Sequence, residues 1–291
     1  MAHIYNYAVK IFKGTQNFLI SRLENHGINL SRDTATTGLT RKQDVIDLLK
    51  RLRPQDNGHS LIRVGGPGDG GYLIPDDLLG ISELFSPGSN RLSNFEKEVA
   101  ERWQIRSYIC DSIEEKPDDL SDFQDFTPAW VGPYTDGEKL ISLAQWVEEK
   151  SQSHGDLMLQ MDIEGAEFQT LLPVSTDLMK RFRIIVIELH FLEALKNRWA
   201  FEQIYFPFFE KILTNFDVVH AHPNNCCGTW NFGDVEFPRL IELTLHRKDR
   251  SKLLIPKISS RHQLDQPCVP KNPDLSLEFD ESGNRFKVVR N

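Results

Sequence analysis

Two short apolar runs that end abruptly in acidic residues constrain the fold of this chain more than any other feature. The first reads LMLQMDIEGAE over residues 157–167, and the second reads RIIVIELHF over residues 183–191. Apolar runs with β-branched residues predict strands that are buried on both faces, as in a parallel sheet. In open α/β sheets, ligands bind beyond the carboxyl ends of such strands. We therefore expect the polar residues that end the two runs to lie side by side over a cleft.

The remainder of the chain alternates predicted strands with predicted helices. Further strands are expected over residues 81–85, 106–110, 217–221 and 240–246, and helices over 93–103, 138–150, 167–172 and 199–215. A repeated β-α-β order with buried strands predicts a doubly wound, Rossmann-like α/β sheet, mostly parallel and with one late antiparallel strand.

The N-terminal region is expected to be helical. Apolar residues at helical spacing predict one helix over residues 4–25, and a second begins near Thr40, where Gln43 can complete a capping box, and stops at Pro54. We expect three parts. They are an N-terminal helical cap and linker (1–58), a catalytic domain (59–250) and an extended C-terminal tail packed on that domain (251–291).

Composition limits the classes of function. A chain of 291 residues with 40% hydrophobic residues can bury a sizeable core, and its net charge of −8 argues against a general nucleic-acid-binding surface. No stretch approaches the length of a transmembrane helix. The four cysteines form no CxxC pair and no zinc-type spacing, which favours a reducing, cytoplasmic compartment.

A glycine-rich stretch, LIRVGGPGDGGYLI, occupies residues 61–74. Gly66, Gly68 and Gly71 fit the dinucleotide-binding pattern GxGxxG, but that pattern requires a helix directly afterwards. Here the sequence from Tyr72 reads as a strand, so a glycine-rich β-hairpin is the better interpretation. Its bare backbone permits close approach to a ligand.

Several of these motifs resemble the FkbM family of S-adenosylmethionine-dependent methyltransferases. The resemblance covers roughly residues 61–250 and is carried by QMDIEGAE at 160–167, IVIELH at 185–190, DGGY at 69–72 and HAHPNN at 220–225. It implies a class I methyltransferase sheet and methylation of hydroxyl groups of sugars or other small metabolites. The chain departs from the class in one place, since the loop after the first strand, residues 85–90, holds a single glycine.

The resemblance also implies a cofactor site for S-adenosyl-L-methionine. The first strand-to-helix turn offers backbone amides to the cofactor carboxylate, and the acidic residue after the second strand accepts hydrogen bonds from the ribose hydroxyls. The residues expected to bind the cofactor are Asp69, Gly70, Gly71, Tyr72, Ser86, Gly88, Ser89, Asp111 and Asp162.

The strand-end residues are candidates for catalysis. We expect Asp162, Glu164, His190 and His222 to act there, and Asp162, Glu188 and His190 to form a hard oxygen and nitrogen set for Mg²⁺ or Mn²⁺. Ordinary structural roles compete with these assignments. Asp162 can cap a helix, Glu164 can lie in a first helical turn, and Glu188 can be a buried carboxylate paired with Arg183.

Histidines at strand ends suit proton abstraction as well as metal binding. His220 is expected to point to the opposite side of the sheet from His222. Because alcohols are weak acids, methyl transfer to a hydroxyl calls for a base or a divalent metal that stabilises the developing alkoxide.

These features together predict an O-methyltransferase that acts on a hydroxyl of a sugar, as a glycan, nucleotide-sugar or polysaccharide unit. Its partners would be a small-molecule or glycan acceptor and no nucleic acid. Two alternatives stay open. One is a catalytically inactive module that binds the cofactor or a glycan, and the other is a nicotinamide-dependent oxidoreductase that uses the glycines of residues 65–71.

Overall fold

A computed structural model describes residues 28–30, 36–88, 94–112, 120–283 and 285–291. The helix expected over residues 4–25 and the cofactor-binding candidate Ser89 lie outside the described residues.

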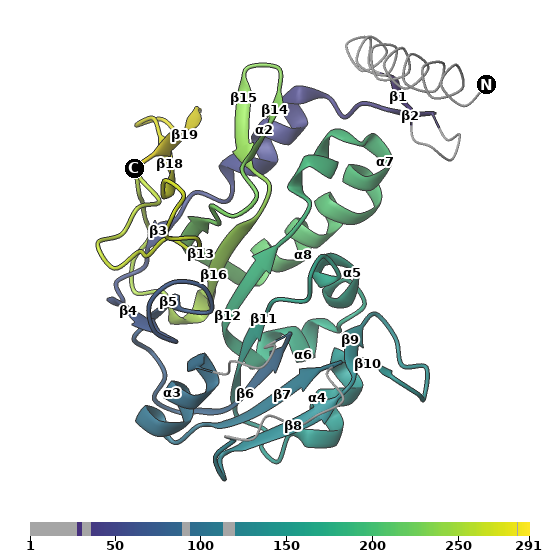
Figure 1. Ribbon diagram of the computed structural model, residues 1–291, viewed down its shortest axis with the longest axis vertical. Helices are drawn as coiled ribbons and strands as arrows, with labels where there is room; N and C mark the ends of the chain where they lie inside the picture. Colours follow the sequence, from purple (N-terminus) through teal and green to yellow (C-terminus); the bar gives the residue numbers. More distant parts are fainter. Residues whose placement is uncertain (1–27, 31–35, 89–93, 113–119, 284) are drawn as a thin grey trace, which may run out of the picture.

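A seven-stranded sheet forms the centre of the protein (Figure 1). In spatial order its strands are β13 (Phe216–Pro223), β16 (Ile241–Arg247), β12 (Phe182–Leu189), β11 (Asp156–Met161), β6 (Ile81–Pro87), β7 (Arg106–Asp111) and β8 (Gln124–Pro128). Only β16 is antiparallel to its neighbours in this sheet, and the other pairs are parallel. The prediction of an α/β sheet, mostly parallel with one late antiparallel strand, is therefore confirmed.

The order of strands reverses beside β6. From β6 the chain moves outward through β7 to β8, and then returns to the other side of β6 through β11 and β12. The crevice at such a switch point is where open α/β sheets bind their ligands. This topology places the expected site at the carboxyl ends of β6 and β11.

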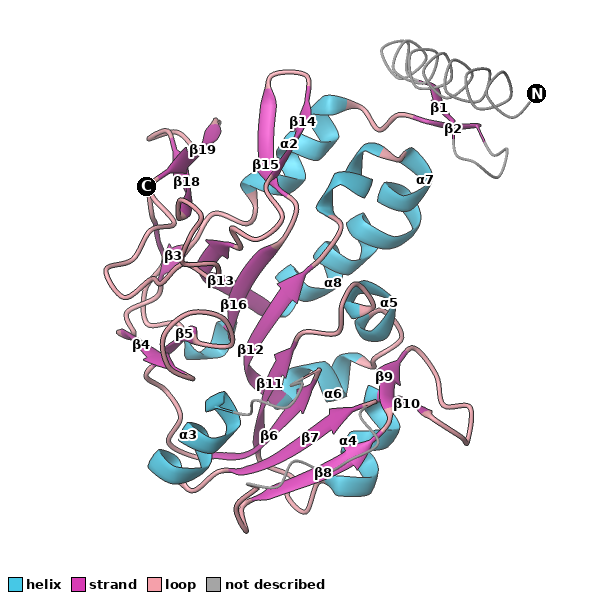
Figure 2. Cartoon of the chain, viewed as in Figure 1, coloured by secondary structure: helices cyan, strands magenta, loops and turns pink. Residues whose placement is uncertain are grey.

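Helices cover both faces of the sheet (Figure 2). Helix α3 and the β4–β5 hairpin share a hydrophobic cluster with Ile184 and Val186, whereas α4, α5 and α8 share one with Ile185 and Ile187. Successive side chains of β12 therefore serve opposite layers, as expected for a strand buried on both faces. The helical elements are α2 (Lys42–Lys50), α3 (Asn94–Trp103), α4 (Leu143–Lys150), α5 (Glu167–Leu171), α6 (Thr176–Arg181), η1 (Leu192–Lys196), α7 (Arg198–Ala200), the π-helical η2 (Phe201–Tyr205), α8 (Phe206–Asn215) and η3 (Lys248–Arg250).

Two-stranded elements surround this core. They are β1 (Ile28–Leu30) with β2 (Thr36–Gly38), β3 (Gln55–Asp56) with β17 (Ile255–Pro256), β4 (Leu61–Val64) with β5 (Tyr72–Pro75), β9 (Trp130–Gly132) with β10 (Leu140–Ser142), β14 (Thr229–Phe232) with β15 (Val235–Pro238), and β18 (Leu275–Phe279) with β19 (Phe286–Arg290). The β4–β5 pair confirms the expected hairpin, and β5 packs against β12, β13 and β16. None of the helices in the described ranges is both long and apolar enough to cross a lipid bilayer.

Three local expectations need correction. The helix expected from residue 138 begins at Leu143, because residues 140–142 pair with β9 and Ser142 Oγ caps the helix by accepting from Gln145 N. The prediction of a capping box at α2 is wrong, because Gln43 Nε2 donates to Asp47 Oδ1 instead. The tail is more ordered than expected, because β18 and β19 form a hairpin whose apolar residues join the main core. The domain limits at residues 58 and 250 stay a prediction.

Candidate active site

Four acidic or imidazole side chains meet at one edge of the sheet. Asp162 follows the last residue of β11, and Glu188 and His190 lie at the end of β12. His190 is 5% exposed. Its Nε2 lies 3.8 Å from Asp162 Oδ1, 3.6 Å from Glu164 Oε2 and 3.9 Å from Glu188 Oε1. The two apolar runs of the sequence thus bring their terminal polar groups together, as expected.

The donor atoms of Asp162, Glu164 and His190 all lie within 4.8 Å of one another, a spacing that suits a shared cation. Asp162 Oδ1 is buried and has no hydrogen-bond partner among the described residues. A buried carboxylate oxygen without a donor is costly. Hard oxygen and imidazole donors of this kind suit Mg²⁺ or Mn²⁺. The set therefore fits a divalent cation, with Glu164 at a distance from His190 similar to that of the expected ligand Glu188.

The environment of the cluster favours neutral carboxyl groups. Burial raises the pKa of Asp162 to about 7, and the charges of Glu164 and Glu167 act in the same direction while His190 opposes them. Burial also raises the pKa of Glu188 well above its ordinary range, together with the charges of Asp162 and Glu242. For His190, burial lowers the pKa, but the hydrogen bond and charge of Glu167 outweigh it and raise the pKa overall. Groups whose pKa values are moved in this way are often functional.

A second acidic group adjoins the first. Carboxylate oxygens of Asp69, Glu188 and Glu242 lie within 4.8 Å of one another, and Asp69 belongs to the loop that joins β4 to β5. Asp69 is exposed, whereas Glu188 and Glu242 are buried. Tyr72 is buried beside them, and Gln160 Nε2 donates to its hydroxyl at 3.4 Å. The glycine-rich hairpin therefore reaches the strand-end site from a distant part of the sequence.

Among the described residues, His222 and His190 have no hydrogen-bond or ion-pair partner in common. The Nδ1 of His222 lies 3.1 Å from Glu242 Oε2 and its Nε2 lies 3.1 Å from Asp274 Oδ1. Although burial lowers it, the hydrogen bonds of Asp274 and Glu242 raise the pKa of His222 to about 10. A ring with both nitrogens engaged and a proton on each at neutral pH holds its carboxylate partners and offers no lone pair.

The expectation for His220 is wrong. The rings of His220 and His222 are stacked with centroids 6.3 Å apart, because residues two apart in a strand point to the same face. His220 Nε2 lies 3.0 Å from Asp265 Oδ1. Both histidines thus face the C-terminal segment.

Glu188 does not pair with Arg183. Arg183 lies near the opposite end of β12, where its Nε donates to Asp156 Oδ2 at 2.7 Å. Glu188 instead accepts from Asn224 Nδ2 at 3.0 Å. Among the described residues, no lysine or arginine pairs with this carboxylate, and the basic group nearest to it is His190, whose Nε2 lies 3.9 Å from Glu188 Oε1.

The turn after β6 lies against the end of β11. Gly88 has φ +85°, and a Cβ there would overlap the carbonyl oxygen of Asp162. Gly88 N donates to Cys110 O, so the turn is held between β7 and β11. Asp111 ends β7 at the same edge. The single glycine of this loop therefore stands where the two halves of the sheet meet.

The Ser86 side chain is directed toward Glu96 of α3 and Gln160 of β11. It is buried, and its hydroxyl contacts the Glu96 carboxyl and Gln160 Oε1. Only the backbone of Ser86 can serve a cofactor in this conformation.

Residues 135–220 match the family model of the methyltransferase FkbM domain. The match confirms the resemblance found in the sequence and supports a methyltransferase. Its limits enclose the motif DIEGAE as well as Glu188 and His190, but not the glycine-rich hairpin or Glu242. No curated protein matches the chain significantly.

Gly70 and Gly71 belong to a loop between two antiparallel strands. Arg63 supports the loop, because its Nε donates to Gly66 O at 2.7 Å and its Nη2 to Gly68 O at 2.9 Å. The strand β5 follows the glycines directly. The dinucleotide-binding interpretation therefore lacks the helix that it requires.

Two contributors escaped the sequence analysis. Glu242 stands inside the apolar run LIELTLHR, the same signal that identified Glu188 in IVIELH. Glu167, the last residue of the DIEGAE motif, was given no role, and it is fully buried and bonded to His190. An acidic residue within an otherwise buried strand was the available signal for Glu242.

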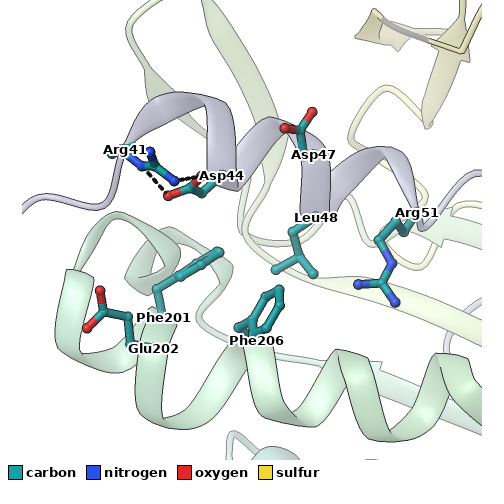
Figure 3. Close-up of a pocket in the computed structure, with 8 residues that line it drawn as sticks. All are labelled: Arg41, Asp44, Asp47, Leu48, Arg51, Phe201, Glu202 and Phe206. Atoms are coloured by element: carbon teal, nitrogen blue, oxygen red, sulfur yellow. Dashed lines mark hydrogen bonds and ion pairs between the residues drawn. The ribbon is translucent and has the colours of Figure 1, made fainter.

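A separate groove of about 400 Å³ lies between α2 and the helical segment η2–α8. In Figure 3, Phe201 and Phe206 point toward Leu48, and Arg41 pairs with Asp44 at one end. None of the candidate site residues lines this groove. It is therefore distinct from the strand-end site.

Proposed function

We propose that this protein is an S-adenosylmethionine-dependent O-methyltransferase that acts on a hydroxyl of a sugar, within a glycan, nucleotide-sugar or polysaccharide unit. The family match supports methyl transfer, and the observation that carries the rest is the group of Asp162, Glu164, Glu188 and His190 at the switch point of the sheet. The group joins hard oxygen donors to an imidazole where such folds bind ligands.

The proposed cofactor site follows the edge formed by β6, β7 and β11. The turn at Gly88 would receive the methionine part, and the Asp111 carboxylate would accept from the ribose hydroxyls, as the same edge does in dinucleotide folds. Asp69, Gly70, Gly71 and Tyr72 would close the site from the hairpin side. Ser86 would contribute its backbone only, because its hydroxyl is bonded to Glu96 and Gln160.

Bound S-adenosyl-L-methionine supplies the methyl group and its own leaving group, so this chain has to align the acceptor and manage the hydroxyl proton. We propose that Asp162 and Glu164 orient the acceptor and that His190 Nε2 receives its proton. Alternatively, a divalent cation, Mg²⁺ or Mn²⁺, would be held by Asp162, Glu188 and His190, with Glu164 available as a further ligand. In that case His190 Nε2 would bind the cation instead of receiving the proton, and the cation would lower the pKa of the acceptor hydroxyl so that its proton passes to solvent. His222 would then hold Glu242 and the C-terminal segment instead of serving as the base.

The chemistry of the site favours an acceptor without net negative charge unless a cation accompanies it. The chain's net charge of −8 would disfavour nucleic acid as a partner. All four cysteines are unpaired, which supports the proposed cytoplasmic location.

Calorimetric titration with S-adenosylmethionine, followed by transfer of labelled methyl to a panel of neutral sugars and nucleotide-sugars, tests the proposal. We expect cofactor binding and transfer to a hydroxyl, with Asp162→Asn severely impaired. Chelation should abolish transfer if the cation assists, and added Mg²⁺ or Mn²⁺ should restore it. Cofactor binding without transfer to any acceptor would favour the inactive binding module, and no cofactor binding would refute the methyltransferase.

A further inference from the structure

The Glu167 carboxylate joins the loop after β11 to His190. Glu167 is fully buried, and its Oε1 accepts from Ile163 N at 3.1 Å and from Gly165 N at 3.0 Å. The same oxygen lies 3.0 Å from His190 Nδ1. One carboxylate oxygen thus holds the backbone of the DIEGAE motif and the ring at the end of the neighbouring strand.

We propose that Glu167 is a positioning residue that fixes the tautomer and ring orientation of His190, so that Nδ1 carries the proton and Nε2 faces the site. Glu167 Oε1 already accepts from two backbone N–H groups, so the His190 nitrogen that faces the same oxygen has to donate. Nε2 is then the nitrogen with the lone pair in the neutral ring, and it is the one that lies near Asp162, Glu164 and Glu188. Carboxylates play this part for imidazoles that bind metals or move protons.

The backbone on both sides of the pair is held in uncommon conformations. Phe191 has φ 57° and Glu164 has φ 56°, values that residues other than glycine adopt rarely. Gly165 lies against the Phe191 ring, where a Cβ would overlap it, and the Tyr205 hydroxyl donates to Phe191 O at 3.0 Å. Such conformations persist where the surroundings over-determine them, and they gather at functional sites.

A purely structural role for Glu167 would stop at the loop. Two backbone N–H groups on Glu167 Oε1 would suffice to close the turn of residues 163–165. The third contact, to a 5% exposed histidine whose other nitrogen faces three carboxylates, points beyond loop closure. What Nε2 does there rests on the proposed function, but its orientation does not.

Nitrogen NMR of the ¹⁵N-histidine-labelled protein tests the proposal without cofactor or acceptor. At about pH 9, above the ordinary titration range of imidazole, we expect the His190 signal, assigned by its loss in His190→Asn, to report the Nδ1–H tautomer. In Glu167→Gln we expect Nε2–H to become populated. We also expect Mn²⁺ alone to bind roughly 10- to 100-fold more weakly in this variant.

Glu83→Gln is the matched control. Glu83 is also a buried glutamate that accepts from a backbone N–H, that of Gln152, but it has no histidine partner among the described residues. This variant should leave the His190 tautomer and Mn²⁺ affinity unchanged. A wild-type ring in the Nε2–H tautomer or still doubly protonated would overturn the proposal, and so would unchanged tautomer and Mn²⁺ affinity in a folded Glu167→Gln. If the tautomer result holds but no acceptor is methylated, Glu167 still positions His190 and the proposed function fails instead.

Discussion

Glu188 and Glu242 face one another directly across the antiparallel strands β12 and β16, and both side chains are buried. Like charges in directly opposed positions destabilise a sheet. The two carboxylates are compensated differently, because Glu242 contacts the protonated ring of His222 while Glu188 accepts only from an amide, that of Asn224, among the described residues. Ionisation of Glu188, which lies beside the candidate site, therefore costs stability.

We expect Glu188→Gln and Glu242→Gln to change the stability of the protein in opposite directions. Glu188→Gln should raise the melting temperature of the ligand-free protein at pH 8, because it removes a carboxyl that is costly to ionise. Glu242→Gln should destabilise by about 1.5–3 kcal/mol, the range for a hydrogen bond to a charged group. Thermal unfolding of both variants measures the contrast, and methyl transfer should fall at least about tenfold in Glu188→Gln. Destabilisation of equal size in both would mean that Glu188 is stably charged.

Glu96 predicts a pH dependence of stability that is separate from the strand-end cluster. It is buried on α3 in contact with the Ser86 hydroxyl, and burial raises its pKa to about 7 although the Ser86 hydrogen bond opposes this. Because the folded-state pKa lies above the ordinary value of 4.5, the folded state binds the extra proton, and stability should fall as pH rises from about 4.5 to about 7.

Unfolding by denaturant across this range measures the effect. Glu96→Gln should flatten the fall and be the more stable form at pH 8. Glu101→Gln, an exposed change on the same helix, should leave the wild-type profile intact. A profile with the same slope in wild type and Glu96→Gln would assign the pH dependence to other groups.

The apolar runs at 157–161 and 183–189 predicted the sheet and one edge of the site because strand burial and strand-end chemistry are local properties of sequence. Contacts between distant segments were less accessible. The approach of Asp69 to Glu188 depends on how the β4–β5 hairpin folds over β12, and the engagement of His222 by Asp274 depends on where the tail returns. The hydrophobic periodicity of the sequence predicts neither contact. The assignment of His220 and His222 to opposite faces was wrong for another reason, because residues two apart in a strand point to the same face.

Asp111 provides a test of the cofactor orientation. It ends β7 beside the Gly88 turn, and we propose that its carboxylate accepts from the ribose hydroxyls. Asp111→Ala should weaken the binding of S-adenosylhomocysteine by about 1.5–3 kcal/mol, as expected for charge-assisted hydrogen bonds. Calorimetric titration gives the change directly. Unaltered affinity would place the ribose elsewhere along this edge.

Gly88 should be intolerant of any side chain. A Cβ there would overlap the carbonyl of Asp162 and come within 3.0 Å of Ile163 Cγ2, and the first of these is a backbone atom that no rotamer change can move. Alanine at this φ also costs roughly 1–2 kcal/mol by itself.

Gly137→Ala isolates the cost of the backbone conformation, because Gly137 has φ +82° and nothing within 4 Å of its Cβ position. We expect Gly88→Ala to be clearly less stable than Gly137→Ala in denaturant unfolding and to lose at least about tenfold in cofactor affinity, an effect of 1.4 kcal/mol. The affinity should fall because relief of the overlap displaces the Gly88 turn, which is proposed to receive the methionine part of the cofactor. Equal stability of the two variants, with native cofactor affinity in both, would show that the Gly88 turn and the end of β11 are farther apart than this structure has them.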